Sequence, residues 1–385
     1  MPPLGLYIHW PFCPSKCPYC DFNSHVREGV DQKRWQEALL TELTHAAHET
    51  QDRTLTTIFF GGGTPSLMAP ETVDALITKA KSLFPHDPNL EITLEANPGT
   101  LTSEKCTAFR AAGVNRLSMG VQSFDETALT FLGRRHSVKQ ALDAINMAAL
   151  TFPRFSFDLI YARPDQTEAT WRQELSQALS YAKGHLSLYQ LTIEPQTAFA
   201  TRLARGETMT LAPDPAATLY EVTEEIMQNA GLPSYEVSNY AALGQECRHN
   251  LLYWNFEDYI GIGPGAHGRI TQKNMKYMTY RHKAPETWLE AVERQGHALE
   301  LKQSLTPQER LQEVTLMGLR LTQGLSLQRL REETGLTPQD AYPGLDVLKR
   351  ESLIRATPSH LVVTPEGRLR LNALISFLLS HIAPP

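Results

Sequence analysis

The chain has 385 residues, with 36 Lys and Arg against 42 Asp and Glu, which gives a net charge of −6. This length suits two to three domains, or one large barrel with an appendix. A slightly acidic chain is not expected to bind nucleic acid generally. No stretch approaches the roughly 18 apolar residues that span a membrane. The short apolar run at residues 4–8 does not fit a signal peptide, so we expect a cytoplasmic protein with at most peripheral membrane contact.

Apolar segments and helical patterns alternate over the first 270 residues. Such alternation indicates parallel strands joined by right-handed helical crossovers. The sequence therefore predicts an α/β fold, a partial or closed TIM-type (β/α) barrel over residues 1–270. Strands are predicted at residues 4–10, 56–60, 91–95, 116–121, 155–161, 186–192 and 235–240. Helices are predicted at residues 32–49, 71–84, 103–112, a pair within 125–150, 167–183 and 214–230.

The pattern changes after about residue 270. Residues 271–300 are predicted to be a connector with a helix near 286–294, and residues 301–385 a winged-helix-like domain. Its helices are predicted at 306–322, 326–334, 340–352 and 369–381, with a small β wing at 361–364. Ten Lys or Arg and eight Asp or Glu in this domain are too balanced for a phosphate-binding surface. Packing against the barrel is the predicted role.

Three clustered cysteines, Cys13, Cys17 and Cys20, follow the first predicted strand with the spacing C-x3-C-x2-C. Thiolates are soft ligands that select zinc, copper or an iron–sulfur cluster. A cubane cluster accepts a ligand on each of four irons, so three cysteines leave one iron open to a small molecule. Two alternatives stay open. One is a zinc site with His9 or His25 as fourth ligand, and the other is a C-x-x-C thiol redox pair.

The cysteine motif, with Tyr19 as its aromatic residue, resembles the signature of the radical S-adenosylmethionine (SAM) family. In that family three thiolates hold a [4Fe–4S] cluster, and SAM chelates the fourth iron. Gly62-Gly63-Thr64-Pro65 after a predicted strand strengthens the resemblance. The resemblance implies that the cysteines hold the cluster and that the SAM site contains Tyr7, Phe22, Gly62, Gly63, Thr64, Glu95, Gln122, Arg134 and Asp158.

Each of these residues also has a structural interpretation. The glycines permit a tight strand-to-helix turn, and a lone Glu95 at a strand end is usually solvated. The carboxyl ends of barrel strands are, however, where such folds place their chemistry. Together, Gln122, Arg134 and Asp158 resemble the branch of the family with oxygen-independent coproporphyrinogen dehydrogenase, where equivalent positions help bind a second SAM. Residues 162–165 read Ala-Arg-Pro-Asp instead of the family's Gly-Leu-Pro-Gly, which puts a bulky cation near the expected pocket.

Two further motifs lie before residue 270. Residues 263–268 match G-x-G-x-x-G, but Pro264 lies inside the motif and no helical pattern follows. We interpret this segment as a glycine loop that closes the pocket. Residues 249–254 read H-N-x-x-Y-W and resemble the HemW-like heme chaperones of the same branch. The resemblance implies heme binding by His249, Asn250, Tyr253 and Trp254. His249 and Tyr253 are four residues apart, so on a helical turn they would share one face.

The chemistry of the second motif fits that expectation. A neutral imidazole is a good axial ligand, and Tyr and Trp rings can pack on a porphyrin. The alternative is a core histidine between packed aromatic rings. The chain lacks C-x-x-C-H, so c-type heme attachment is not expected.

The resemblance implies a heme chaperone that carries a SAM-ligated cluster and passes heme to apo-hemoproteins, with respiratory proteins as candidate acceptors. The alternatives are an oxygen-independent coproporphyrinogen III dehydrogenase or another radical SAM enzyme. Phe22 stands where the dehydrogenase has a further cysteine, and only twelve residues precede Cys13, where it has a long extension. We therefore expect no dehydrogenase activity on coproporphyrinogen, while enzymatic activity of another kind stays open.

Overall fold

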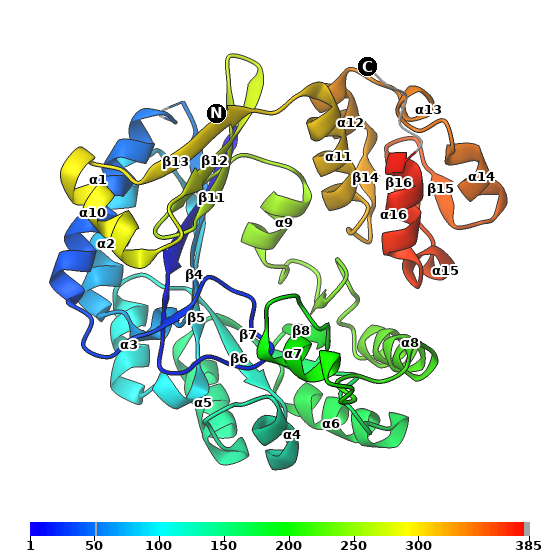
Figure 1. Ribbon diagram of the computed structural model, residues 1–385, viewed down its shortest axis with the longest axis horizontal. Coiled ribbons are helices and arrows are strands. Elements are labelled where there is room, and N and C mark those ends of the chain that lie inside the picture. The colour runs from blue at the N-terminus through cyan, green and yellow to red at the C-terminus, as the bar shows by residue number, and fades with distance from the viewer. Residues whose placement is uncertain (51, 381–385) are drawn as a thin grey trace.

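The structure is a computed structural model that describes residues 1–50 and 52–380 (Figure 1). One sheet organises most of the chain. Among the described residues it has eleven strands, in the order β13 (Leu299–Ser304), β12 (Met275–Arg281), β11 (His267–Gln272), β10 (Tyr259–Ile262), β1 (Pro3–Trp10), β4 (Thr54–Gly62), β5 (His86–Ala96), β6 (Arg116–Gln122), β7 (Arg154–Tyr161), β8 (His185–Gln190) and β9 (Asn239–Ala241).

The central strands β1, β4, β5, β6, β7 and β8 pair in parallel, as predicted. The edges β13 and β9 do not pair with each other, so the barrel is partial rather than closed. β1 shows why these segments form strands, because Leu4, Leu6, Ile8 and Trp10 are fully buried at every second position.

Helices cover the outside of this sheet (Figure 1). Most lie where a 3.6-residue period predicts them, and their apolar faces join one large core with the strands. They are α1 (Gln32–His48), α2 (Pro70–Leu83), α3 (Ser103–Ala111), α4 (Glu126–Phe131), α5 (Val138–Thr151), α6 (Glu168–Tyr181), α7 (Ala198–Ala204), α8 (Pro213–Asn229) and α10 (Pro285–Gln295), with 3-10 turns η1 (Pro65–Leu67) and η2 (Pro98–Thr100).

The strand predicted at residues 235–240 is wrong over most of its length. Only Asn239 and Tyr240 of that range belong to β9, which pairs antiparallel with β8 at the sheet edge. The side chain of Glu236 accepts hydrogen bonds from the Ser238 amide (3.2 Å) and from Asn239 Nδ2. These local bonds stabilise a turn, which competes with an extended strand.

The sequence did not predict β10, β11, β12 and β13, which extend the sheet beyond β1. β10 pairs parallel with β1, and the other three form an antiparallel series. The small pair β2 (Phe12–Cys13) and β3 (His25–Val26) was also not predicted. Of the helix α9 (Arg248–Trp254), only a helical turn with His249 and Tyr253 on one face was expected. β2, β3 and β10 are short, while β11, β12 and β13 carry polar residues at many positions, so their apolar patterns are weak.

The C-terminal residues have a core of their own, with helices on a small sheet. The predicted helices and the wing are present, although they are shorter and more divided. They are α11 (Pro307–Gly318), β14 (Leu325–Ser326), α12 (Leu327–Thr334), α13 (Pro338–Ala341), α14 (Leu345–Arg350), β15 (Ile354–Ala356), β16 (His360–Val363), α15 (Pro365–Arg368) and α16 (Leu371–Ser380). Residue 381 of the last predicted helix lies outside the described residues.

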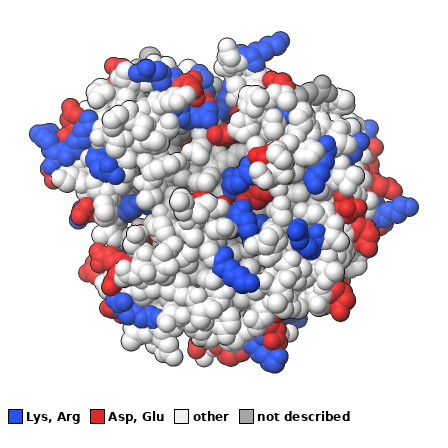
Figure 2. Space-filling model, turned by 180° about the vertical axis from the view of Figure 1, so that it is seen from behind, with Lys and Arg blue, Asp and Glu red and all other residues white. Residues whose placement is uncertain are grey.

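Charged side chains of both signs are interspersed over the face shown in Figure 2, with several Lys and Arg near its centre. None of the helices in the described ranges combines the length and the apolar composition needed to cross a bilayer.

A buried ion pair joins the extended sheet to the C-terminal helices. Lys276 of β12 lies 2.8 Å from a carboxylate oxygen of Glu333 in α12 and donates to the Phe256 carbonyl at 2.7 Å. Its ammonium also lies 3.9 Å from the centre of the Phe256 ring. Burial lowers the pKa of Lys276, while the Glu333 charge opposes this shift.

We predict that Glu333→Ala destabilises the chain by about 3 kcal/mol, because it takes the nearer carboxylate from a buried ammonium and leaves only Asp258 Oδ1, at 3.8 Å. Chemical denaturation followed by circular dichroism measures this loss. The matched control is Glu332→Ala on the same helix, where the carboxylate is exposed and a change within about 0.5 kcal/mol is expected. Equal stability of the two variants would contradict a stabilising role for the Lys276 pair.

Candidate functional site

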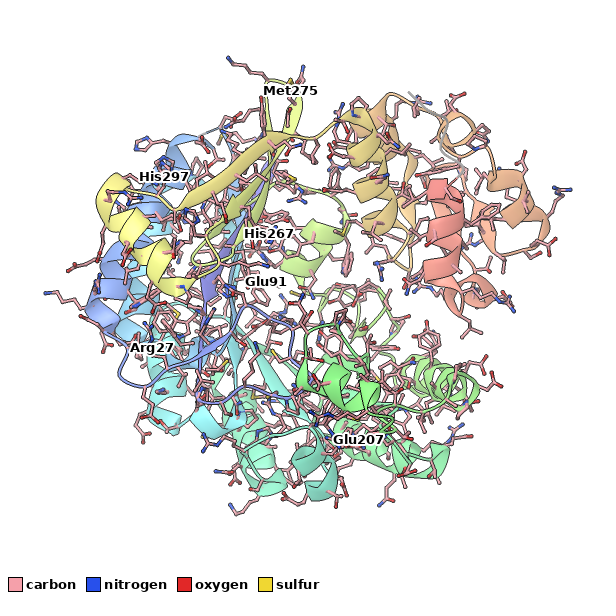
Figure 3. The ribbon with its side chains drawn as sticks, in the orientation of Figure 1. Arg27, Glu91, Glu207, His267, Met275 and His297 are labelled. Carbon is pink, nitrogen blue, oxygen red and sulfur yellow. The ribbon has the colours of Figure 1, made fainter. Side chains whose placement is uncertain are left out.

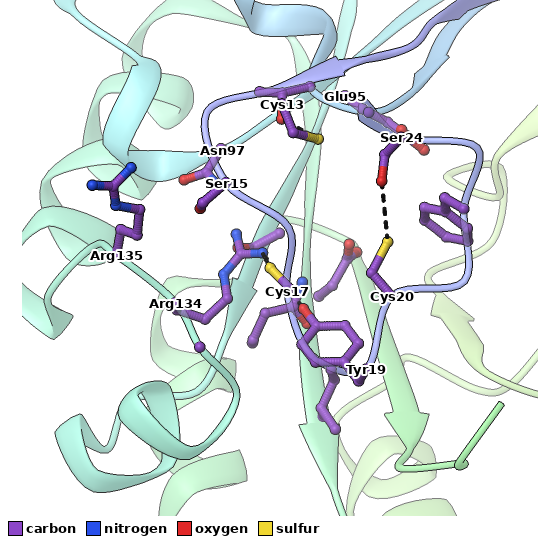
Figure 4. A pocket seen from close by; sticks show the side chains of 18 of the residues that line it. Cys13, Ser15, Cys17, Tyr19, Cys20, Ser24, Glu95, Asn97, Arg134 and Arg135 are labelled. Carbon is purple, nitrogen blue, oxygen red and sulfur yellow. Dashed lines mark hydrogen bonds between the residues drawn. The ribbon is translucent and has the colours of Figure 1, made fainter. Parts of the chain in front are cut away.

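The three clustered cysteines line one cavity at the carboxyl ends of the parallel strands (Figure 4). Cys13 lies in β2, while Cys17 and Cys20 follow in the loop that precedes β3. The cavity encloses about 580 Å³ and also contains the glycine segment after β4 and the polar residues that end the next strands. Residues from distant parts of the sequence therefore meet the cysteine loop here, as predicted for a barrel of this kind.

Each of the three thiols has a polar neighbour. Thr64 Oγ1 lies 3.3 Å from Cys13 Sγ, Arg134 Nη1 lies 3.4 Å from Cys17 Sγ, and Ser24 Oγ lies 3.9 Å from Cys20 Sγ. Figure 4 marks the Arg134 and Ser24 contacts. These groups can stabilise thiolates, the form in which cysteine binds metals.

The thiols themselves are free, and burial raises the pKa of Cys13 and of Cys20. Within the described ranges, no three His, Cys, Asp or Glu side chains converge tightly enough to hold a single metal ion. A cubane cluster does not require such convergence, because each thiolate binds a different iron. The donor set and the volume of the cavity fit that group.

The glycine segment lies against the start of the cysteine loop. Gly62 has a φ of +113°, and a Cβ there would lie 2.6 Å from the His9 ring. A Cβ at Gly63 would lie 2.8 Å from the Phe12 carbonyl oxygen. Both glycines are thus required by close packing as well as by a positive φ at Gly62. The Gly62 amide donates to Glu95 Oε2 at 3.1 Å, which fixes that carboxyl at the cavity wall.

Two buried carboxyl groups face this cavity. Burial, and then the charge of Asp158, raises the pKa of Glu95 to about 8. Burial also raises the pKa of Asp158 to about 6. Both groups therefore hold protons more strongly than a solvated carboxyl does, and a ligand that donates hydrogen bonds or carries positive charge would favour their ionised forms.

Three buried polar atoms at the cavity have no hydrogen-bond partner among the described residues. They are Asp158 Oδ1, Gln122 Oε1 and Arg134 Nε. Gln122 also has a φ of +76°, an uncommon backbone conformation for a residue other than glycine. Unpaired buried polar atoms are costly, and such outliers concentrate at functional sites. The arrangement fits a polar ligand that would supply the missing partners.

The cation expected near this cavity lies elsewhere. The Arg163 side chain is buried, donating to the Ile160 carbonyl at 2.6 Å and to Glu174 Oε2 at 2.8 Å. Arg163 is not among the residues that line the cavity. Ala162 and Asp165, which stand where the family has glycines, keep left-handed φ values of +59° and +60°. The substitution therefore retains the loop geometry without filling the pocket, and the expectation about Arg163 was wrong.

A second cavity, of about 950 Å³, lies between the extended sheet, α9 and α11. Its aromatic lining includes Tyr253 and Trp254 of α9 and Tyr259 of β10, and Tyr253 and Tyr259 pack edge to face at 4.5 Å. The buried indole nitrogen of Trp254 has no hydrogen-bond partner among the described residues. Tyr7, expected in the SAM site, lines this second cavity rather than the first.

The two cavities share a wall. The residues that line both are Asp21, Phe22, Gly62, Glu95 and Tyr189. Phe22 is 60% exposed, an unusual state for a phenylalanine, and it stands at the position discussed above for a further cysteine. Ligands bound in the two cavities would therefore share contacts with these residues.

His249 does not face either cavity. Its side chain is 1% exposed, its Nδ1 lies 2.7 Å from Thr57 Oγ1, and its Nε2 lies 2.8 Å from the Tyr253 hydroxyl. Burial lowers the pKa of His249 to about 3, so the imidazole is neutral. The expected shared helical face of His249 and Tyr253 exists. Of the four residues in the motif, Asn250, Tyr253 and Trp254 line the second cavity and His249 supports them from the core.

The glycine loop at residues 263–268 is the turn between β10 and β11. Gly263 and Gly265 have φ values of +96° and +73°. Asn23 Nδ2 donates to the Pro264 carbonyl at 2.9 Å, which ties the loop to the cysteine segment. The loop lines the second cavity through Gly265 and His267. The side chain of His267 was not singled out from the sequence, although it lies inside the motif that was.

Comparisons with known proteins agree with this geometry. The family model described as the radical SAM superfamily matches residues 7–178, and the HemN C-terminal domain matches residues 305–370. The chain is 37% identical over 386 residues to the heme chaperone HemW of Escherichia coli, covering 99% of each chain. It is 36% identical over 387 residues to the mitochondrial radical S-adenosyl methionine domain-containing protein 1 of Bos taurus, covering 98% and 88%.

The fold also matches that of a solved structure. The solved structure of coproporphyrinogen III oxidase (HemN) from Escherichia coli matches with a TM-score of 0.82 at 24% identity, covering 99% of this chain and 91% of the other. Fold and site together define a radical SAM protein. The chain belongs to this superfamily and, within it, to the family that includes HemW of Escherichia coli. Membership in the superfamily implies a [4Fe–4S] cluster and SAM as cofactors.

We predict that Glu95 makes the metal-free chain less stable as the pH rises. The pKa of Glu95 is about 8 in the folded chain against an ordinary value of 4.5. The protonated carboxyl therefore favours folding, and its contribution is full below pH 4.5 and lost between pH 4.5 and about 8. Glu95→Gln stays neutral and should reduce the fall in melting temperature between pH 5 and pH 8.

The matched control is Glu71→Gln on the exposed face of α2, which should leave the pH profile of the wild type unchanged. Thermal unfolding at several pH values gives both profiles. A Glu95→Gln profile as steep as that of the wild type would contradict the elevated pKa.

Proposed function

We propose that this chain is a heme chaperone, which binds heme in the second cavity and passes it to apo-hemoproteins. The observation that carries the proposal is the aromatic cavity of about 950 Å³, which shares a wall with the cysteine-lined cavity. Pockets of this size, lined by aromatic rings with a few polar groups, suit a large flat ligand. The names of the curated HemW relatives support the same function.

The first cavity is the proposed site of the cluster and SAM. Cys13, Cys17 and Cys20 would hold the cluster, and the cluster with SAM supplies reductive chemistry when bound. The SAM site would be formed by Gly62, Gly63, Thr64, Glu95, Gln122, Arg134 and Asp158, most of which are buried or partly buried at this cavity. The unpaired atoms of Gln122, Arg134 and Asp158 would gain hydrogen bonds from this polar ligand.

Tyr7 and Phe22 take different places in this proposal. Phe22 lines both cavities and would separate or contact the two ligands, whereas Tyr7 lines only the second. The Tyr7 hydroxyl lies 3.0 Å from His9 Nδ1, so it is already paired within the wall. We assign Phe22 to both sites and Tyr7 to the heme side.

Heme would contact the aromatic side chains of α9. Tyr253 and Trp254 offer ring faces and edges to the macrocycle, and Asn250 lines the same cavity. A bond between His249 and the iron would require its imidazole to leave two hydrogen bonds and turn out of the core. We therefore assign His249 to the positioning of Tyr253, with which it shares the 2.8 Å contact. Respiratory acceptors and a cytoplasmic location are part of this proposal.

We predict that replacement of Cys13, Cys17 or Cys20 by Ala abolishes the cluster, because two thiolates cannot hold a cubane that already lacks a fourth. Iron and sulfide analysis after anaerobic reconstitution measures the loss. Cys106→Ala is the matched control, since Cys106 is buried in α3 away from the cavity, and iron content should stay unchanged. Bound zinc without sulfide in the reconstituted wild type would overturn this assignment.

We predict that Trp254→Ala weakens heme binding about tenfold, or about 1.4 kcal/mol, because the macrocycle loses a ring contact. Heme titration followed by absorbance measures the affinity. The matched control is Tyr277→Ala on β12, a partly exposed aromatic residue that lines neither cavity, and it should bind heme as the wild type does. Equal affinities of the two variants would place heme elsewhere.

The variant His249→Ala distinguishes a structural role of His249, the positioning of Tyr253, from ligation of the heme iron. It leaves the hydroxyls of Thr57 and Tyr253 without their partner, so we predict a loss of stability of about 1–3 kcal/mol. Heme affinity should fall less than in Trp254→Ala. A well-folded His249→Ala variant that has lost the heme spectrum would instead show that the imidazole ligates the iron.

A further inference from the structure

We propose that His267 is the side chain that ligates the iron of heme in the second cavity, an inference that rests on the proposed function. Figure 3 places His267 between the strands of the extended sheet and α9.

Among the described residues that line the second cavity, the histidines are His9 and His267. The ring of His9 is fully engaged, since Nδ1 lies 3.0 Å from the Tyr7 hydroxyl and Nε2 lies 2.9 Å from the Asn23 carbonyl oxygen. His267 is exposed, and neither of its ring nitrogens has a hydrogen bond within the described part of the chain. A neutral imidazole with a free nitrogen is the usual protein ligand of heme iron.

The backbone of His267 is held firmly although its ring is free. It begins β11 and pairs with Tyr280 of β12, whose ring packs edge to face against the imidazole at 4.5 Å. The preceding turn is anchored where the Gly263 amide donates to the buried carboxylate of Glu42 at 2.8 Å. A ligand on a rigid element keeps its geometry better than one on a free loop.

The sheet face that carries His267 also carries suitable neighbours. Residues two apart on a strand point to the same face, so Arg269 lies on the same face, opposite Tyr259 in the pairing of β10 with β11. Both line the cavity, and Tyr259 contacts Tyr253 of α9. A macrocycle bound through His267 would therefore lie among the aromatic side chains already assigned to it.

The charges of the cavity fit the two propionates of heme. Lys283 and Arg320 line it, and neither forms an ion pair with a carboxylate of the described residues. Four of the five acidic residues in the lining accept hydrogen bonds from other residues, whereas Asp21 is exposed. The pairs are Glu313 with Arg269, Glu257 with Arg329, Glu236 with Asn239, and Glu95 with the Gly62 amide. The unpaired Trp254 indole nitrogen is a further donor for an anionic group. The side chains of Lys283 and Arg320, together with the Trp254 N–H, therefore favour binding of the propionate edge of heme in this cavity.

The test is a titration of the full-length chain with ferric heme, read by its absorbance and by electron paramagnetic resonance. The wild type should show the spectrum of an imidazole-ligated heme. His267→Ala should lose that signature and bind heme at least tenfold more weakly, and added free imidazole should restore the signature. His267→Gln serves as a second variant with a side chain of similar size, and thermal unfolding confirms that both variants fold.

The matched control is His282→Ala, since His282 follows β12 near the same turn but does not line the cavity, and its spectrum should equal that of the wild type. If the spectrum of an imidazole-ligated heme persists in folded His267→Ala, this inference is overturned, while the proposed heme chaperone function stands. A wild type that binds no heme would overturn the proposed function and this inference together.

Discussion

The end of β4 and the residue after it lie so close to the end of β1 and to β2 that no Cβ fits at Gly62 or Gly63. The contacts are with the His9 ring and with the carbonyl oxygen of Phe12. This close approach holds the cysteine loop over the carboxyl ends of the strands. It also brings the Gly62 amide to Glu95, so one packing constraint positions both the cysteine loop and the Glu95 carboxyl.

The same constraint divides the interior into two adjoining cavities. The wall between them contains Gly62, Glu95, Phe22 and Tyr189. Lys276 and Glu333 hold the C-terminal helices against the extended sheet, and α11 of that unit completes the second cavity. The proposed heme site thus depends on the C-terminal residues, whereas the cysteine-lined cavity is formed by the barrel alone.

The central barrel strands and most helices could be predicted because their apolar periods are long and regular. The edge elements could not, because β10 is short and β11 carries polar residues at most of its positions. Residues 235–240 form a turn through local bonds of Glu236. The family resemblance named residues that line the first cavity, with Tyr7 as an exception, and strand ends in a parallel sheet do meet at one edge. Arg163 was misjudged because its pairing with Glu174 depends on tertiary contacts.

The residues that line the second cavity could be predicted less well from sequence motifs. The spacing of His249 and Tyr253 predicted a shared helical face, which is present, but spacing does not show whether that face meets a cavity or the core. Burial places His249 in the core and Tyr253 at the cavity wall. His267 escaped notice because its role depends on strand register, which brings it opposite Tyr280 and beside the aromatic residues of α9.

The central claim is that the chain carries heme rather than converting a porphyrinogen. The direct test is anaerobic incubation of the cluster-reconstituted chain with SAM and a reductant, and with either coproporphyrinogen or heme, followed by addition of an apo-hemoprotein. The account predicts a bound heme spectrum that moves to the acceptor, and no decarboxylated porphyrin. Formation of protoporphyrinogen, or the absence of any heme spectrum, would contradict it.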